Sequence, residues 1–63
     1  MSNRKKQRAE DAARLRWIGR SIIALGAEVE QMAPGQRSSR GALLRGYASV
    51  LRYIGGELTA WGQ

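Results

Sequence analysis

The stretch LRWIGRSIIALGAEVEQM (residues 15–32) carries a spacing pattern that returns in LRGYASVLRYIGGELTAW (residues 44–61). In both stretches the large apolar residues recur at alternating intervals of three and four positions, the a and d pattern of a heptad repeat in packed α-helices. The pattern predicts two helices whose apolar stripes have the same length. The stripes are Leu15, Ile18, Ile22, Leu25, Val29 and Met32 in the first helix and Leu44, Tyr47, Leu51, Ile54, Leu58 and Trp61 in the second.

The segment between the two stretches contains Pro34 followed by Gly35. A residue that precedes proline is biased out of the α region, so we expect the first helix to end near Met32. Gly35 is free to take the left-handed conformation that often follows a helix end. A short connection favours antiparallel neighbours, so the chain is predicted to form an antiparallel helical hairpin. Folding back at this point pairs each a residue of one helix with a d residue of the other.

The first helix is expected to start near Glu10 and Asp11, because acidic side chains are favourable at the positive end of a helix. The basic residues before them are expected to form a flexible arm. The predicted organisation is an arm over residues 1–9 and a hairpin over residues 10–63, with helices at about 10–32 and 39–61 and a turn at 33–38.

Glycine recurs inside these predicted helices, although an interior helical glycine costs roughly 1 kcal/mol relative to alanine. Every e position of the heptads is glycine or alanine. A small residue at every seventh position lets two backbones approach closely and recover dispersion energy. The alternative is that the glycines mark flexibility or a kink at Gly55–Gly56. The e positions are Ala12, Gly19, Gly26 and Ala33 in the first helix and Gly41, Ala48, Gly55 and Gly62 in the second.

A chain of 63 residues buries little apolar surface as an isolated monomer. It has no cysteine for a disulfide and no histidine for the usual zinc sites. A single hairpin also cannot cover an apolar stripe that Leu43 and Val50 widen at g positions. We therefore expect two hairpins to dimerise into a four-helix bundle, with the a and d residues in its core; a different partner chain is the alternative.

In its length, its two-helix layout and the two heptad stretches quoted above, the chain resembles the Rop family of plasmid-encoded RNA-binding proteins. The resemblance implies a dimer of helical hairpins. It includes no functional motif of that family, so it implies no RNA-binding residue.

Positive charge is concentrated near the N-terminus. Eleven Lys and Arg residues oppose five Asp and Glu residues, which gives a net charge of +6. A short basic run is typical of a solvated arm, and it also suits contact with nucleic acid or with an acidic protein or membrane surface. The candidate phosphate-binding residues are Arg4, Lys5, Lys6 and Arg8 in the arm and Arg16 and Arg45 in the helices.

Three large apolar residues fall outside the predicted seam: Trp17 and Tyr53 at c positions and Ile23 at a b position. Rings beside arginines are typical of protein interfaces and of nucleic-acid contacts, because guanidinium groups bind phosphates and rings stack or fill pockets. The alternative is that these side chains pad the edge of the bundle. The predicted partner-binding residues are Trp17, Arg20, Ile23, Arg52 and Tyr53.

The residue types of most enzyme active sites are missing or scattered. There is no His or Cys, the five acidic residues show no paired spacing, and no phosphate-binding glycine motif is present. We therefore expect no enzymatic activity, no metal and no cofactor. Charged residues interrupt every apolar stretch, and the basic start leads into no apolar signal region, so we expect a cytoplasmic protein without a membrane span.

Two functional hypotheses follow. The first is a small regulatory protein, of the kind used by phages and plasmids, that binds and modulates or inhibits a larger protein through arginine and aromatic residues. The second is a regulator that binds RNA or DNA through the basic arm and the helix arginines. Most of the net charge lies in the arm, which leaves the hairpin body weakly charged and favours the first hypothesis.

Overall fold

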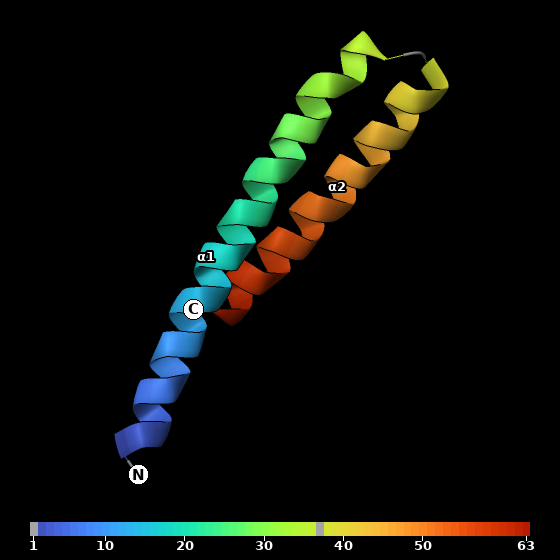
Figure 1. Cartoon of the computed structure of the whole chain (residues 1–63). Helices are drawn as coiled ribbons and strands as arrows, with labels where there is room; N and C mark the ends of the chain where they lie inside the picture. The colour runs from blue at the N-terminus through green and yellow to red at the C-terminus, as the bar shows by residue number, and fades with distance from the viewer. Residues whose placement is uncertain (1, 37) are drawn as a thin grey trace.

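The computed structural model describes the backbone of residues 2–36 and 38–63, and their side chains except at positions 2, 3 and 38. The chain forms helix α1 (Ser2–Met32), a 3-10 turn η1 (Ala33–Gly35) and helix α2 (Ser38–Trp61). The two helices lie side by side and antiparallel in a rod about 55 Å long and 13 Å wide (Figure 1). The predicted all-α hairpin is confirmed.

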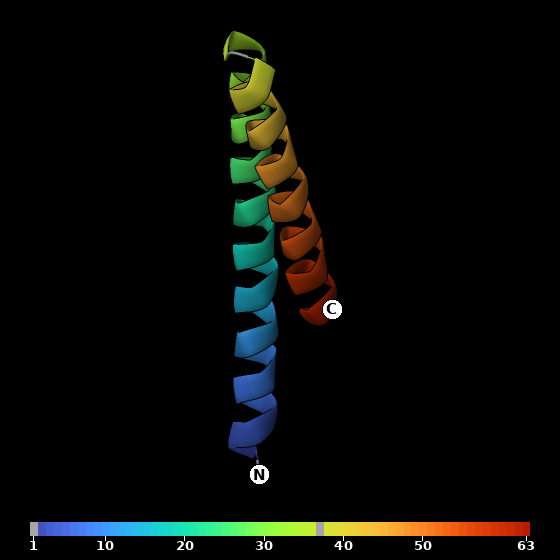
Figure 2. The ribbon, with the colours of Figure 1, turned by 90° about the vertical axis from the view of Figure 1, so that its right-hand side faces the viewer.

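Helix α1 begins at Ser2, well before the predicted start at Glu10. Residues 2–11, called the extension below, continue past the end of α2 without a neighbouring helix (Figures 1 and 2). Arg, Lys, Gln and Ala are good helix formers, and this propensity continues the helix although its first turn contains no acidic residue. Residue 1 of the predicted arm and residue 37 of the predicted turn lie outside the described residues.

None of the described residues in the reversal between the helices is left-handed. Helix α1 ends at Met32, as predicted, and Pro34 lies in the first turn of η1. Gln36 is extended, and its backbone N–H donates to the carbonyl oxygen of Ala33 over 3.1 Å. The expected left-handed conformation of Gly35 is wrong, because no described glycine has a positive φ.

The small e residues occupy the centre of the contact between α1 and α2. All of them are buried except Ala12, which is half-buried. Ala33 and Ala48, 2% and 1% exposed, are the buried apolar residues of the described chain. Among the side chains that the structure describes, no large one is fully buried.

The contact is rotated relative to the predicted a-to-d pairing. The six d side chains are 38–77% exposed, and the a residues are half-buried. Pairing of a with d across the contact was therefore a wrong prediction for the single hairpin. The physical reason is that every e residue is glycine or alanine: the backbones approach along the e row, which leaves a residues on one side and b residues on the other.

The distances from a Cβ atom added at each glycine to its nearest neighbours show how closely the two helix backbones approach each other. A Cβ atom added at Gly55 would lie 2.6 Å from the carbonyl oxygen of Gly19 and 3.0 Å from the backbone nitrogen of Ile23. At Gly19 it would lie 2.6 Å from the carbonyl oxygen of Gly55. These distances are too short for any side chain, so the close contact predicted for the e glycines is confirmed. Gly46 and Gly56 have no such neighbour within 4 Å.

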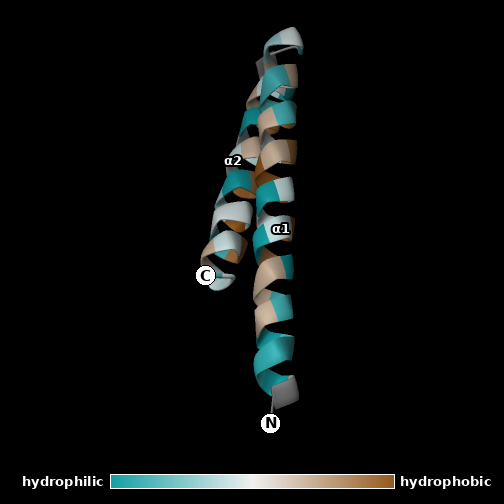
Figure 3. Cartoon of the chain, turned by 90° about the vertical axis from the view of Figure 1, so that its left-hand side faces the viewer, coloured by the Kyte–Doolittle hydropathy of each residue, from teal (hydrophilic) through white to brown (hydrophobic). Residues whose placement is uncertain are grey.

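Because the e row faces the other helix, the remaining rows divide the hairpin into two faces. The apolar face is formed by the a and d residues of both helices, with Leu43 and Val50 added on α2. The opposite, polar face contains the b and f positions, among them Arg16, Arg20, Arg45 and Arg52. The hydropathy colouring shows the hydrophilic extension giving way to mixed and hydrophobic residues where α1 pairs with α2 (Figure 3).

Candidate binding surfaces

The apolar face is left uncovered in the hairpin. Its exposed members are the six d residues, of which Ile18 is the least and Trp61 the most exposed, together with Leu43 and Val50. A contiguous apolar surface of this kind normally marks an interface. It runs the length of the paired helices, from the turn to the end of α2.

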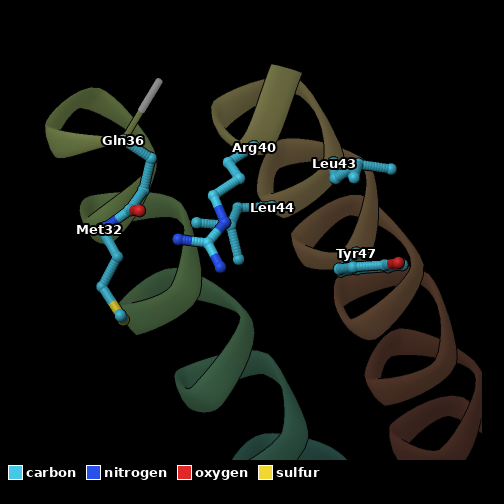
Figure 4. A pocket seen from close by; sticks show the side chains of 6 residues that line it. All are labelled: Met32, Gln36, Arg40, Leu43, Leu44 and Tyr47. Atoms are coloured by element: carbon cyan, nitrogen blue, oxygen red, sulfur yellow. The ribbon is translucent and has the colours of Figure 1, made fainter. Parts of the chain in front are cut away.

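At the turn end, the apolar face contains an open pocket of about 310 Å³. Arg40 extends from α2 into the space between the helices, on the side of Met32 and Gln36, and Leu43, Leu44 and Tyr47 complete the lining (Figure 4). The pocket was not predicted from the sequence. The sequence feature that could have predicted it is the spacing of Arg40, Leu43, Leu44 and Tyr47. Four residues with this spacing surround a hole in the surface of a helix.

Two of the predicted partner-binding residues are largely exposed. Trp17 and Tyr53 are 71% and 70% exposed. Both occupy c positions, which point away from the helix contact, so the rings lie on opposite outer edges of the hairpin and not in a single patch. Each ring is therefore a separate candidate anchor.

Exposed Arg14 and Arg20 lie one helical turn before and after Trp17. Arg20 was among the predicted partner-binding residues, whereas Arg14 was missed. Arg14 could have been predicted from its position three residues before Trp17, because this spacing places the two side chains next to each other on a helix. On the same helix, the Ser21 hydroxyl donates to the carbonyl oxygen of Trp17 over 2.9 Å.

Ile23 is not on the outer surface where the sequence pattern placed it. Its side chain is half-buried, and its Cγ1 atom lies 2.6 Å from the position of a Cβ atom at Gly55. The prediction that Ile23 lies outside the helix contact was wrong. Once the e row is central, the b row borders the contact, and Ile23 covers Gly55.

Two of the predicted arginines have partners inside the hairpin. Arg52 of α2 forms an ion pair with Glu30 of α1, each side chain 48% exposed. Arg16 is half-buried and donates to the carbonyl oxygen of Gly62, at the C-terminal end of α2 where a cation is favourable. Arg16 therefore has a structural role, while Arg20 and Arg45 are exposed on the polar face.

The extension carries the other predicted phosphate-binding residues. Arg4, Lys5, Lys6 and Arg8 are all exposed. In register with the rest of α1, Arg4, Lys5 and Arg8 occupy d, e and a positions, where the paired part of the helix is apolar or small. The extension therefore cannot continue the apolar face, and its charges are available to a partner.

Within residues 2–36 and 38–63, no three acidic, histidine or cysteine side chains gather into a metal-binding group. Over the same residues, neither helix has an apolar segment long enough to cross a bilayer. Comparison of the chain with protein-family models, with curated proteins and with solved structures finds no match.

Proposed function

We propose that the protein is a non-enzymatic regulatory binding protein that modulates or inhibits a larger protein. The observation that carries the proposal is the exposure of Trp17 and Tyr53, whose rings belong neither to the helix contact nor to the apolar face. Large rings left in solvent on a rigid helix lose little conformational entropy when a partner covers them. Trp, Tyr and Arg are also the residue types enriched among interface hot spots.

Trp17 is the stronger of the two anchors. Arg14 and Arg20 lie one turn away on either side and are exposed, so a ring and two guanidinium groups are presented together. Such a group fits an apolar pocket with an acidic rim on the target. Tyr53 has Val50 and Gly56 at the corresponding positions, so neither position adds a charged side chain to its ring and hydroxyl.

In this proposal the working form is a homodimer of hairpins. The apolar face contains most of the exposed large side chains, and a second copy is the simplest chain that matches it. A two-fold dimer would also present each anchor twice, which raises the apparent affinity for a multivalent target.

We expect Trp17→Ala to weaken binding to the target by tenfold or more, on the order of 1.4 kcal/mol. The target is first captured with the wild-type protein from nuclease-treated lysate and then titrated in purified form by calorimetry. Gln31→Ala is the matched control, since Gln31 is exposed at a c position of the same helix. Equal affinity of the Trp17→Ala and Gln31→Ala variants would exclude Trp17 as an anchor.

The extension favours a second candidate, a regulator that binds RNA or DNA. Four exposed basic residues lie on the extension, which has no helix beside it (Figure 2). Binding through phosphates weakens with a log–log salt slope of roughly −0.9 per contact on duplex DNA, whereas an aromatic anchor is nearly insensitive to salt. A short duplex DNA and a single-stranded RNA, each titrated at several salt concentrations, separate the two candidates. A steep slope that disappears with the extension would make nucleic acid the primary partner.

A further inference from the structure

We propose that the apolar face is closed by a second copy whose turn lies at the opposite end, so that Trp61 of each copy fills the pocket at the turn of the other. The inference rests on the dimer in the proposed function and specifies its geometry. Three observations carry it: the area of the apolar face, the position of its midpoint and the match between Trp61 and the pocket.

The area is sufficient for a stable dimer. Eight large side chains at d and g positions lie 38–77% exposed on this face. If each half-exposed side chain buries about 100 Å², in line with the 150–250 Å² that an aromatic ring buries in full, one copy contributes on the order of 800 Å². That is the contribution of each partner to an interface of standard size.

The two apolar stripes share one midpoint along the rod. The stripe of α1 is centred between Ile23 and Ala24, and that of α2 between Arg52 and Tyr53. These centres are level in the hairpin, because a Cβ atom at Gly19 would contact both Gly55 and Thr59. A two-fold axis across the rod at this level therefore superposes the six a and d residues of each stripe on their own reversed copies.

The same axis places the most exposed apolar ring opposite the pocket. Reversal about the midpoint of α2 brings Trp61 level with Leu44, in the middle of the group Arg40, Leu43, Leu44 and Tyr47 (Figure 4). Four residues with this spacing form the hole that receives a knob in helix packing. Trp61 is 77% exposed and at the other end of the same face, so a single hairpin cannot bring it there.

Charge favours the same orientation. If the two turns lay at the same end, the extensions of both copies would lie together and bring their basic residues within about one Debye length, 8–10 Å. With the turns at opposite ends, the extensions project from opposite ends of a rod in which one chain is already 55 Å long. Their mutual repulsion is then screened.

The contribution of Trp61 can be tested by sedimentation equilibrium. We expect Trp61→Ala to raise the dimer dissociation constant at least tenfold, whereas Trp17→Ala should change it less than twofold. Trp17→Phe leaves Trp61 as the single indole, and its emission should shift to the blue as the protein concentration rises through the dissociation constant. An unshifted emission, or an unchanged constant in Trp61→Ala, would overturn the placement of Trp61 in the pocket.

The orientation is tested with spin labels, since the chain has no native cysteine. Labels at Ala9→Cys, in the exposed extension, should lie about 45 Å apart with turns at opposite ends and under about 30 Å apart with turns at the same end. Labels at Ala24→Cys, near the midpoint, are close in either arrangement and report the dimer itself.

A short Ala9 distance with a short Ala24 distance would overturn the orientation and retain the dimer. The measurement is made at about 100 μM protein, a concentration on the order of the dissociation constant of a weak specific dimer. Absence of dipolar coupling at both sites under these conditions would overturn the dimer as well. Neither result bears on target binding by Trp17, which its own titration tests.

Discussion

Gly55 and Gly56 are adjacent in the sequence and lie in opposite environments. Gly55 is buried against the backbone of α1, whereas Gly56 is exposed and has no neighbouring atom within 4 Å of an added Cβ. The difference is a matter of space alone, since both lie within α2 and neither has a positive φ. One glycine permits the helix contact, and the other only lowers the helix propensity.

Substitution by alanine should therefore change stability in opposite directions at these two positions. We expect Gly55→Ala to destabilise the fold by about 1 to 3 kcal/mol, because the methyl group overlaps the carbonyl oxygen of Gly19. Gly56→Ala should stabilise it by up to about 1 kcal/mol through helix propensity. Urea denaturation at one fixed protein concentration compares the two variants; stabilisation by both would show that the helices do not approach closely at Gly55.

At the scale of the helix, α1 consists of two segments, one that packs on another helix and one that does not. From Ala12 onward it packs on α2, whereas the extension has no helix beside it and residues 4–11 are all exposed (Figure 2). A side-chain hydrogen bond from Gln7 to Asp11, 3.2 Å long, is the one bond of its kind within the described part of the extension. Basic residues near a helix N-terminus oppose the helix dipole, so the extension is held mainly by propensity and is the first part of α1 to fray.

Deletion of residues 2–8 should therefore lower the helical circular-dichroism signal without lowering the denaturation midpoint of the hairpin. The deletion should also slow association with an acidic partner and flatten its salt dependence, because a charged segment outside the contact steers more than it anchors. Stopped-flow association at two salt concentrations measures both effects. A complex that is abolished by the deletion would contradict this role.

At the scale of the whole molecule, the dominant fact is that none of the large side chains described by the structure is fully buried. The hairpin contact buries small residues, which contribute close backbone packing but little apolar area. Burying a large apolar side chain is worth about 1.5–3 kcal/mol, and most of the large side chains of this chain become buried only when another chain covers the apolar face.

The stability of the molecule should consequently depend on its concentration. We expect the melting temperature to rise with total protein concentration, because in the proposed dimer association and folding of the hairpin would be coupled. Calorimetry over a hundredfold concentration range, with sedimentation equilibrium at the same concentrations, measures the effect. A folded monomer at micromolar concentration with a constant melting temperature would contradict it.

The heptad spacing alone was enough to predict two helices, the helix end at Met32 and an antiparallel hairpin with small residues at every e position. These features follow from local helix propensity and from the period of the apolar residues. Both properties can be read from the sequence without knowledge of the tertiary structure. The helical state of residues 2–9 was missed because the charge pattern at a helix start was given more weight than helix propensity. The availability of Trp17 and Tyr53 was predicted, and the structure adds that their rings lie on opposite edges.

The rotation of the two helices was decided only by the tertiary structure. A heptad of apolar a and d residues does not reveal whether d or e lies against the neighbouring helix. Here the backbones approach along the glycines, so e is central, Ile23 covers Gly55 and the d side chains turn outward. The rotation depends on the distance between two backbones, a property of the packed pair that neither helix sequence contains by itself.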